Sequence, residues 1–344
     1  MVIVTLTGEG WVAEPLVRSQ EPTRLDARSD VIDTMSRRIA LGLLATGTLA
    51  ACAGENQRPL PPDRRLSWAP PSLDSGTTIE VTATNHHLEL DARTDYRLRL
   101  PSDVPLRVEG GLVVIGGRNV VIVGGEIQIP EGLSQEADEW TGRRGLYLKD
   151  QSGVVHVEGL RFSGDLAEGI DLAQSRDATV QLQNISVDSV RGSYEGNHAD
   201  LLQVWAGPRV LRVDGFSGTT DYQGFFLLPN QHYDGPRPDL FDLRRVRIRG
   251  VEGSAYLLWA PKGDLDWLKL TDVRLAVDDS RSRKQLLRPV DTWSGVDVAG
   301  GDEAVDLLTA EEATMPEGTP GLSYRSPGYR DDPLPASTPL GRNS

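Results

Sequence analysis

Short apolar segments recur along the middle of the chain at a nearly constant spacing. Gly145 and Gly169 stand 24 positions apart, and Leu201 and Gly224 stand 23 apart, each at the start of such a segment. Each segment is followed by a second short apolar strand and then by a third. We therefore expect coils of three strands, whose first strands are Arg144–Leu148, Glu168–Leu172, Asp200–Val204, Gln223–Leu227 and, more weakly, Ser254–Leu258.

A single residue separates the second strand from the third in each coil. Such a one-residue corner favours residue types that tolerate the left-handed backbone conformation. Four of the five corner residues are of these types, and the full set is Gly159, Asn184, Gly215, Arg245 and Asp272. The corners also argue against an antiparallel β-sandwich, which needs hairpin signals every 8–12 residues or so.

Alternation within the first strands predicts which side chains face inward. Leu146, Ile170, Leu202 and Phe225 should stack in one row, because coils bury their apolar side only against neighbouring coils. The three-strand coils and tight corners resemble the right-handed parallel β-helix of the pectin-lyase-like superfamily. This resemblance implies an all-β solenoid, which we expect over residues 77–290.

Composition limits the classes of partner. The 344 residues carry a net charge of -14, which argues against DNA or RNA as the main partner. The chain has one cysteine, so it holds no disulfide framework and no thiolate metal cluster. No nucleotide-binding, zinc-protease or nucleophile-elbow motif occurs in it.

The lone cysteine stands where a lipoprotein signal would place it. Met35 opens a short basic start, and the apolar run after it ends in Leu49-Ala50-Ala51-Cys52, similar to a bacterial lipobox. The alternative is an apolar helix with a stray thiol. We expect residues 1–51 to be a wrongly assigned start plus a signal peptide, with lipid on Cys52 anchoring an exported protein in the membrane. Residue 53 is Ala rather than Asp, so we expect the outer membrane or cell surface.

Two further segments lie outside the repeat. Residues 52–76 contain five prolines and read as an extended tether between the anchor and the body. Residues 291–344 read as an irregular C-terminal segment and tail.

The repeat is interrupted twice by about eight extra residues. The first insertion, Arg191–Asn197, comes just before a first strand, and the second, Pro229–Pro238, comes just after the next first strand. Insertions on both sides of one strand column would wall a groove. In the pectin-lyase-like superfamily the substrate groove runs along this column, so the resemblance implies the same location.

Carboxylates gather in that column. The coil alignment stacks Arg144, Glu168, Asp200, Gln223 and Ser254 in one row and Tyr147, Asp171, Gln203, Phe226 and Leu257 in an outward row three positions later. Glu168, Asp171 and Asp200 would then share an outward patch, with Asp200 at its centre. Polar ladders on solvated β-helix faces are the ordinary alternative. The candidate catalytic residues are Asp200, Asp171, Glu168, Asp221 and His198.

Neighbouring polar and aromatic side chains are candidates for substrate contact. His198, Asp200 and Gln203 form a His-x-Asp-x-x-Gln stretch similar to one in several polysaccharide-active β-helices. The aromatic candidates could stack on sugar rings, although inward aromatic side chains of a β-helix more often belong to the core. The candidate substrate-binding residues are Gln203, Tyr222, Tyr147, Trp205 and His232.

Paired carboxylates support two chemistries on sugars. A glycosidase uses one as general acid and the other on water or on the sugar itself. A lyase neutralises the substrate's carboxylate, usually through Ca²⁺, while a base removes a proton. We expect a polysaccharide or oligosaccharide partner, no metal site and no cofactor, except Ca²⁺ if the protein is a lyase. A non-catalytic glycan- or protein-binding module and a structural envelope protein are the alternatives.

Overall fold

The computed structural model describes residues 4–7, 10–13, 64–73, 75–134, 140–231, 236–251, 253–263, 265–277, 283–293, 296–300 and 315–330. The chain divides into two units, residues 1–59 and 60–344. In the first unit, β1 (Val4–Thr7) pairs antiparallel with β2 (Gly10–Ala13), where the sequence showed no periodic pattern. Cys52 lies outside the described residues.

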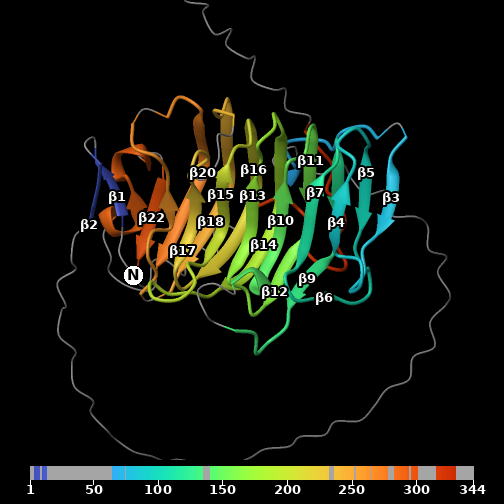
Figure 1. Cartoon of the computed structure of the whole chain (residues 1–344), viewed down its shortest axis with the longest axis horizontal. Coiled ribbons are helices and arrows are strands. Elements are labelled where there is room, and N and C mark those ends of the chain that lie inside the picture. Colours follow the sequence, from blue (N-terminus) through green and yellow to red (C-terminus); the bar gives the residue numbers. More distant parts are fainter. Residues whose placement is uncertain are drawn as a thin grey trace, which may run out of the picture. The chain divides into compact units, whose positions relative to one another are not determined.

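The second unit is all-β, with parallel strands in curled sheets stacked like a solenoid (Figure 1). One sheet has eight strands, in the order β21-β19-β17-β15-β13-β10-β7-β4. Because neighbours come from successive coils, every strand pairs with the corresponding strand one coil away. The bounds are β4 (His87–Leu90), β7 (Leu112–Gly116), β10 (Arg144–Lys149), β13 (Glu168–Ala173), β15 (Asp200–Ala206), β17 (Gln223–Leu227), β19 (Leu258–Trp259) and β21 (Leu287–Arg288).

The second sheet, which we call the long sheet, contains twelve strands and includes the second and third strands of each coil. In later coils these two strands join into one long bent strand. The bounds are β3 (Thr77–Glu80), β5 (Tyr96–Arg99), β6 (Leu106–Arg107), β8 (Val120–Val123), β9 (Glu126–Ile129), β11 (Val154–Glu158), β12 (Arg161–Gly164), β14 (Thr179–Val190), β16 (Val210–Thr220), β18 (Leu240–Gly250), β20 (Leu268–Val277) and β22 (Val296–Gly300). Short helices are η2 (Trp140–Arg143), α1 (Arg283–Leu286) and η3 (Val290–Trp293).

The predicted inward row is confirmed. Leu146 pairs with Ile170, Ile170 with Leu202, and Leu202 with Phe225, and all four are buried. Their side chains join a continuous apolar core that includes Val157, Leu182 and other residues of the long sheet. The stack therefore removes the apolar face of each coil from water, which is the main force that holds the coils together.

All five predicted corner residues have a positive φ, between 49° and 76°. Arg245, whose type does not favour this conformation, adopts it at φ 49°. Its guanidinium is held by the buried carboxylate of Asp214, with Nε and Nη2 at 2.6 and 2.5 Å from the two oxygens. A tertiary ion pair thus stabilises the one corner whose residue type the rule does not explain.

The alignment of the fifth coil is wrong by two residues. Phe226 pairs with Trp259, whereas the sequence pattern placed Leu257 in that outward position. Leu257 is fully buried, and its backbone carbonyl oxygen accepts a hydrogen bond from Phe225 N. Ser254 likewise lies before the first strand, because β19 begins only at Leu258. The register of the fifth coil is therefore set by the burial of Leu257 and Leu258, and not by the spacing of the earlier coils.

The solenoid also continues past its expected end at residue 290. β22 (Val296–Gly300) lies in the segment predicted to be irregular, yet it pairs in parallel with β20 from Val273↔Val296 to Val277↔Gly300. Its alternating Val-Asp-Val-Ala-Gly sequence extends the long sheet by one strand. No helix in the described part of the chain is long and apolar enough to cross a membrane.

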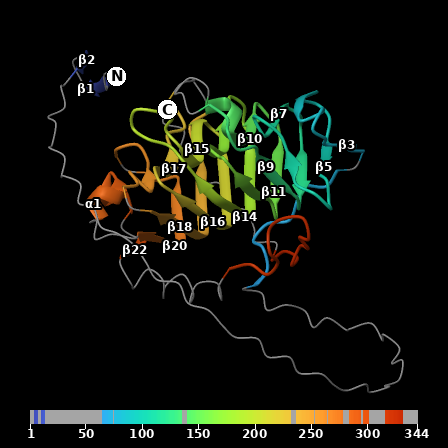
Figure 2. The same cartoon turned by 90° about the horizontal axis from the view of Figure 1, so that it is seen from below.

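Two segments without regular strands form a clasp, defined as residues 64–73 and 315–330, on the outer side of the long sheet (Figure 2). Leu66 forms a parallel bridge with Tyr329, and Arg64 forms an ion pair with Glu317. The clasp overlaps the predicted tether, so a free tether does not extend beyond residue 63. The clasp is held against the sheet by polar contacts. Buried donors and acceptors of the sheet form hydrogen bonds with the backbone of the clasp.

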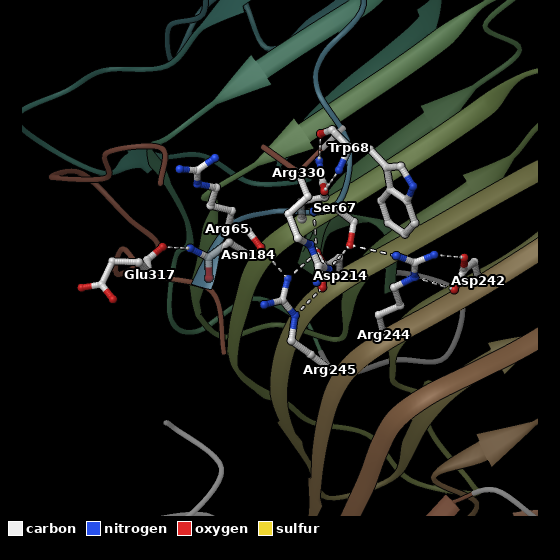
Figure 3. A network of polar contacts seen from close by, with 11 residues as sticks. Arg65, Ser67, Trp68, Asn184, Asp214, Asp242, Arg244, Arg245, Glu317 and Arg330 are labelled. Atoms are coloured by element: carbon white, nitrogen blue, oxygen red, sulfur yellow. Dashed lines mark hydrogen bonds and ion pairs between the residues drawn. The ribbon is translucent and has the colours of Figure 1, made fainter. Parts of the chain in front are cut away.

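Asp214 is the centre of this contact (Figure 3). Besides Arg245, its carboxylate accepts a hydrogen bond from Ser67 N at 2.8 Å. Gln183 accepts from Trp68 N and donates to Trp68 O, while Arg330 donates to Ser67 Oγ at 2.6 Å. The two ends of the unit are therefore tied to each other and to one buried acid.

We predict that Asp214→Asn lowers the free energy of unfolding by about 3–5 kcal/mol, because it leaves the buried Arg245 guanidinium without its counter-charge. The measurement is chemical denaturation at neutral pH. The matched control is Asp266→Asn, which removes the partner of Arg237 in an exposed ion pair, 70% and 68% accessible, and should cost less than about 1 kcal/mol. Equal effects of the two substitutions would contradict the central role of Asp214.

Candidate functional site

Pairing of β10, β13, β15 and β17 places the candidate residues in two adjacent rows. Arg144 pairs with Glu168, Glu168 with Asp200, and Asp200 with Gln223. Three positions later, Tyr147, Asp171, Gln203 and Phe226 pair in the same order. Since neighbouring strands lie about 4.8 Å apart, the acids of the two rows come together as the sequence predicted.

The three acids, which we call the carboxyl trio (Glu168, Asp171 and Asp200), are buried rather than solvated. They are 2%, 0% and 0% exposed, so the expected open acidic patch is wrong. Arg144 covers the trio: its Nε lies 2.5 Å from Asp171 Oδ2, and its guanidinium lies over the Tyr147 ring at 4.3 Å. An arginine that forms an ion pair on one side and stacks on an aromatic ring on the other excludes water from the acids.

The members of the trio differ in their partners. Glu168 Oε2 accepts a hydrogen bond from the backbone N–H of Asp200 at 3.0 Å. Asp171 faces the Arg144 guanidinium. Neither carboxyl oxygen of Asp200 has a hydrogen-bond partner among the described residues. Such a group costs free energy to bury in its charged form, so its environment favours the neutral acid.

The pKa values follow these environments. Burial, with the nearby charges of Asp200 and Asp171, raises the pKa of Glu168 well above its ordinary value. Burial and the charge of Asp171 do the same for the pKa of Asp200. Burial also raises the pKa of Asp171, to about 6, although the Arg144 charge opposes the rise. The site therefore holds protons at a pH where exposed carboxyls are ionised.

Buried acids beneath the clasp behave differently. Glu158 accepts hydrogen bonds from Tyr324 Oη, Tyr329 Oη and His156 Nε2, at 2.6–2.8 Å. Burial opposes the change, but hydrogen bonds from His156, Ser326 and Tyr329 hold the pKa of Glu158 below its usual value. Asp214 is equally well supplied with donors. The same solenoid thus satisfies its acids on one face and leaves Asp200 unsatisfied on the other, which marks the trio as the candidate site.

An aromatic stack borders the trio on the side of the first insertion. The Tyr222 and His198 rings stack with centroids 5.3 Å apart, and Tyr194 stacks on the other side of His198 at 6.2 Å. Burial raises the pKa of Tyr222 to about 12, and the charge of Asp200 adds to this effect. Tyr222 and Asp200 are therefore close, while His198 and Tyr194 are exposed to solvent.

Buried polar contacts fix the first insertion beside the trio. Arg143, which is fully buried, donates to Asn197 Oδ1 at 3.1 Å and forms an ion pair with Asp165 at 2.9 Å. Asp221 Oδ1 accepts from the backbone N–H of Gly192 at 2.8 Å. Asp221, a candidate catalytic acid, is therefore an anchor of this loop and does not join the trio. His198 is likewise outside the trio, in the exposed aromatic stack.

The outer face of the eight-stranded sheet also carries a row of aromatic side chains. Tyr147 and Trp205, both half-buried, lie 6.0 Å apart between ring centroids, beside the half-buried Gln203. Phe226 contacts Trp259 at 4.9 Å, and Trp259 contacts Tyr256 at 5.4 Å. Because of the two-residue register error, the sequence alignment placed neither Trp259 nor Tyr256 in this row.

Arg288 ends this aromatic row. It pairs with Trp259 in the strand register, and its guanidinium lies over that ring at 4.6 Å. The second insertion begins beside β15, where Asn230 forms an antiparallel bridge with Ala206. His232, a candidate substrate contact in this insertion, lies outside the described residues. Within the described residues, no group of three or more His, Cys, Asp or Glu side chains is placed to hold a metal ion.

We predict that Asp200→Asn makes the protein more stable than wild type above neutral pH. A carboxyl whose pKa is higher in the native than in the unfolded state makes the free energy of unfolding fall as pH rises between the two values. The substitution removes this fall for Asp200, and each pKa unit of elevation corresponds to about 1.4 kcal/mol. Denaturation from pH 4 to pH 8 measures it. The control Asp103→Asn, at an exposed site, should leave the pH dependence unchanged, and a destabilised Asp200→Asn protein at pH 8 would contradict the prediction.

Comparisons with protein-family models, with curated proteins and with solved structures find no match to this chain. The chain's function is therefore inferred from its own residues and contacts: a sealed carboxyl trio, the arginine that covers it and the aromatic row beside it.

Proposed function

We propose that the protein binds an extended polysaccharide along the outer face of the eight-stranded sheet. The observation that carries the proposal is the row of partly exposed Tyr147, Gln203, Trp205 and Trp259 side chains on that face. Aromatic rings present flat apolar surface at a low entropic cost, and amide groups beside them form hydrogen bonds with hydroxyl-rich ligands. Nucleic acid is a poor alternative, because the chain carries a net charge of -14.

A right-handed parallel β-helix of the pectin-lyase-like type is the scaffold we propose. It is supported by the parallel pairing of successive coils and by the positive-φ corners. Connections between parallel strands of one sheet are right-handed in about 98% of cases. In such a stack the aromatic row follows the solenoid axis. Tyr147 and Trp259 lie four strands apart, or roughly 19 Å, which suits a polymer more than a single sugar.

We predict that Trp205→Ala weakens polysaccharide binding at least about tenfold, or 1.4 kcal/mol, because it removes half of the Tyr147–Trp205 ring pair. Affinity electrophoresis through gels that contain plant, bacterial or fungal polysaccharides measures the effect. The control Val123→Ala changes an exposed apolar side chain on the other sheet and should bind like wild type. Equal retardation of all three proteins would contradict this location of the site.

Hydrolysis of the bound polymer is the second candidate function, and the unsatisfied, proton-holding trio favours it. Asp200 as a neutral acid would give its proton to the glycosidic oxygen as the C–O bond breaks. Asp171 as a carboxylate would take a proton from water as the water oxygen bonds to the anomeric carbon. Because both acids are buried, the polymer reaches them only when the side chains over them, Arg144 among them, move aside.

A lyase mechanism has less support from this site. A lyase of the kind considered above usually places Ca²⁺ between protein carboxylates and an acidic substrate. The described residues hold no set of ligands fit for a metal, and the one guanidinium beside the trio already faces Asp171. No step of the proposed reaction therefore involves Ca²⁺.

We predict that Asp200→Asn abolishes the release of new reducing ends from a polysaccharide that the protein retains, while gel retardation stays within about twofold of wild type. The reason is that asparagine has the same shape but cannot donate the proton. The matched control is Asp221→Asn, at the loop anchor, which should keep measurable cleavage. A wild-type protein that binds but never cleaves would leave the protein as a glycan-binding module.

We also propose that the protein is exported and anchored in the outer membrane or at the cell surface by lipid on Cys52. The basic start, the apolar run and the lone cysteine of the sequence support this. Residues 53–63 connect Cys52 to the clasp in the sequence.

We predict that protein isolated from its native membrane begins at Cys52 with added lipid, because the lipobox-like stretch is a cleavage and acylation signal. Intact-mass measurement checks the prediction. Cys52→Ser should remove the lipid and leave the thermal unfolding of the body unchanged. Recovery of an unmodified chain with residues before Cys52 would contradict the anchor.

A further inference from the structure

Four ionisable side chains lie together with almost no exposure to solvent. The carboxyl trio and Arg144 are each less than a tenth exposed, and with every group ionised they would carry a net charge of −2. Burying uncompensated charge costs far more than binding a proton. At least one carboxyl of the trio must therefore be neutral in the folded protein, and the contacts indicate which one.

The contacts of Arg144 indicate which acid of the trio is ionised. Its Nε faces Asp171 at 2.5 Å, and its guanidinium lies over the Tyr147 and Trp205 rings at 4.3 and 5.8 Å. Stacking on two rings holds the planar group in one orientation. Arg144 thus compensates Asp171 directly, and its charge also acts on Glu168 of the neighbouring strand, where it opposes the rise in pKa that burial causes.

Glu168 and Asp200 are the two acids that do not form an ion pair with Arg144, and one of them must hold the proton. Their hydrogen-bond partners differ. Glu168 accepts the backbone N–H of Asp200, a bond that favours a charged or accepting carboxyl. Asp200 accepts no hydrogen bond from any described residue. As a neutral acid, Asp200 is a donor, and its two strand neighbours in the row are Glu168 and Gln223.

We propose that Arg144 keeps Asp171 ionised and thereby leaves the proton of the site on Asp200, so that Asp200 is the proton donor and Arg144 a positioning residue. The inference deepens the hydrolytic candidate, and its meaning for catalysis rests on that proposed function. The protonation states themselves can be measured without any substrate. Burial raises the pKa of both Glu168 and Asp200, so the contacts, and not the pKa shifts, distinguish the two acids.

The other titratable groups around the trio do not reverse this arrangement. Tyr222 stays neutral because burial raises its pKa to about 12. Burial lowers the pKa of His87, with smaller effects from His86 and Arg144, so His87 adds no second cation at neutral pH. Asp221 is bound to Gly192 N, and the Arg143 guanidinium faces Asp165 and Asn197. His198 Nε2 lies 3.3 Å from the Tyr194 carbonyl oxygen, and its ring stacks on Tyr222 and Tyr194.

Infrared spectroscopy in D₂O at neutral pH tests the proposal, because a protonated carboxyl has a C=O band distinct from that of a carboxylate. The wild-type protein should show this band, Asp200→Asn should lose it, and Asp171→Asn should keep it. The control Asp103→Asn should match wild type. A band that persists in Asp200→Asn and disappears in Glu168→Gln would overturn the assignment to Asp200, and no band in wild type would overturn the proposal as a whole.

Variants of Arg144 test the positioning role. Arg144→Gln should raise the titration midpoint of Asp171 by about 1–3 pH units, seen as a second carboxyl band that Asp171→Asn removes. Arg144→Lys keeps the charge and should restore the midpoint at least in part, which separates charge from packing if Arg144→Gln is poorly folded. An unchanged Asp171 midpoint in Arg144→Gln would overturn the role of Arg144.

The outcomes separate this inference from the proposed function. The expected bands in a protein that binds no polysaccharide would uphold the proton arrangement and reject the function. Polysaccharide binding that depends on Trp205, in a protein without a protonated Asp200, would uphold the function and reject the proton arrangement.

Discussion

Stacking of one coil on the next, in register, is the constraint on which the rest of this protein depends. Each first strand is short and cannot bury its apolar side alone, so Leu146, Ile170, Leu202 and Phe225 reach a core only by lying one above another. The same register that aligns these inward residues also aligns the outward ones. The carboxyl trio is therefore a consequence of core packing: once the apolar row is stacked, Glu168 and Asp200 must be neighbours.

Buried acids on two faces of the solenoid differ in whether they have hydrogen-bond donors. Beneath the clasp, Asp214 and Glu158 receive donors from Arg245, from Ser67 and from the C-terminal tyrosines, and they bind the ends of the unit to its body. In the trio, Asp200 receives none. A fully satisfied network adds specificity to a fold, whereas an unsatisfied acid is a cost that a structure rarely bears without use. This difference supports the proposed hydrolytic role of the trio, beside the aromatic row that carries the proposal of polysaccharide binding.

Much of this could be predicted from the repeat, but burial could not. Spacing and alternation identified the inward row, the five corners and the pairing of Arg144 with Glu168 and of Glu168 with Asp200. They failed at Trp259, because the fifth coil has a loop of different length before its first strand. They also assigned Asp221 to the acids, although its carboxylate holds the first insertion through Gly192. A repeat fixes which residues are neighbours, but not how loops of irregular length pack over them.

The sequence by itself determined a solenoid of parallel strands, because the alternation of apolar residues and the left-handed corners are local properties that repeat from coil to coil. Only the tertiary structure decided that the trio is sealed, that Arg144 covers it, and that residues 64–73 meet residues 315–330. Those contacts join segments far apart in the chain, and they depend on which buried donor meets which buried acceptor. Pairing of this kind leaves no periodic trace in a sequence, since each such contact occurs once.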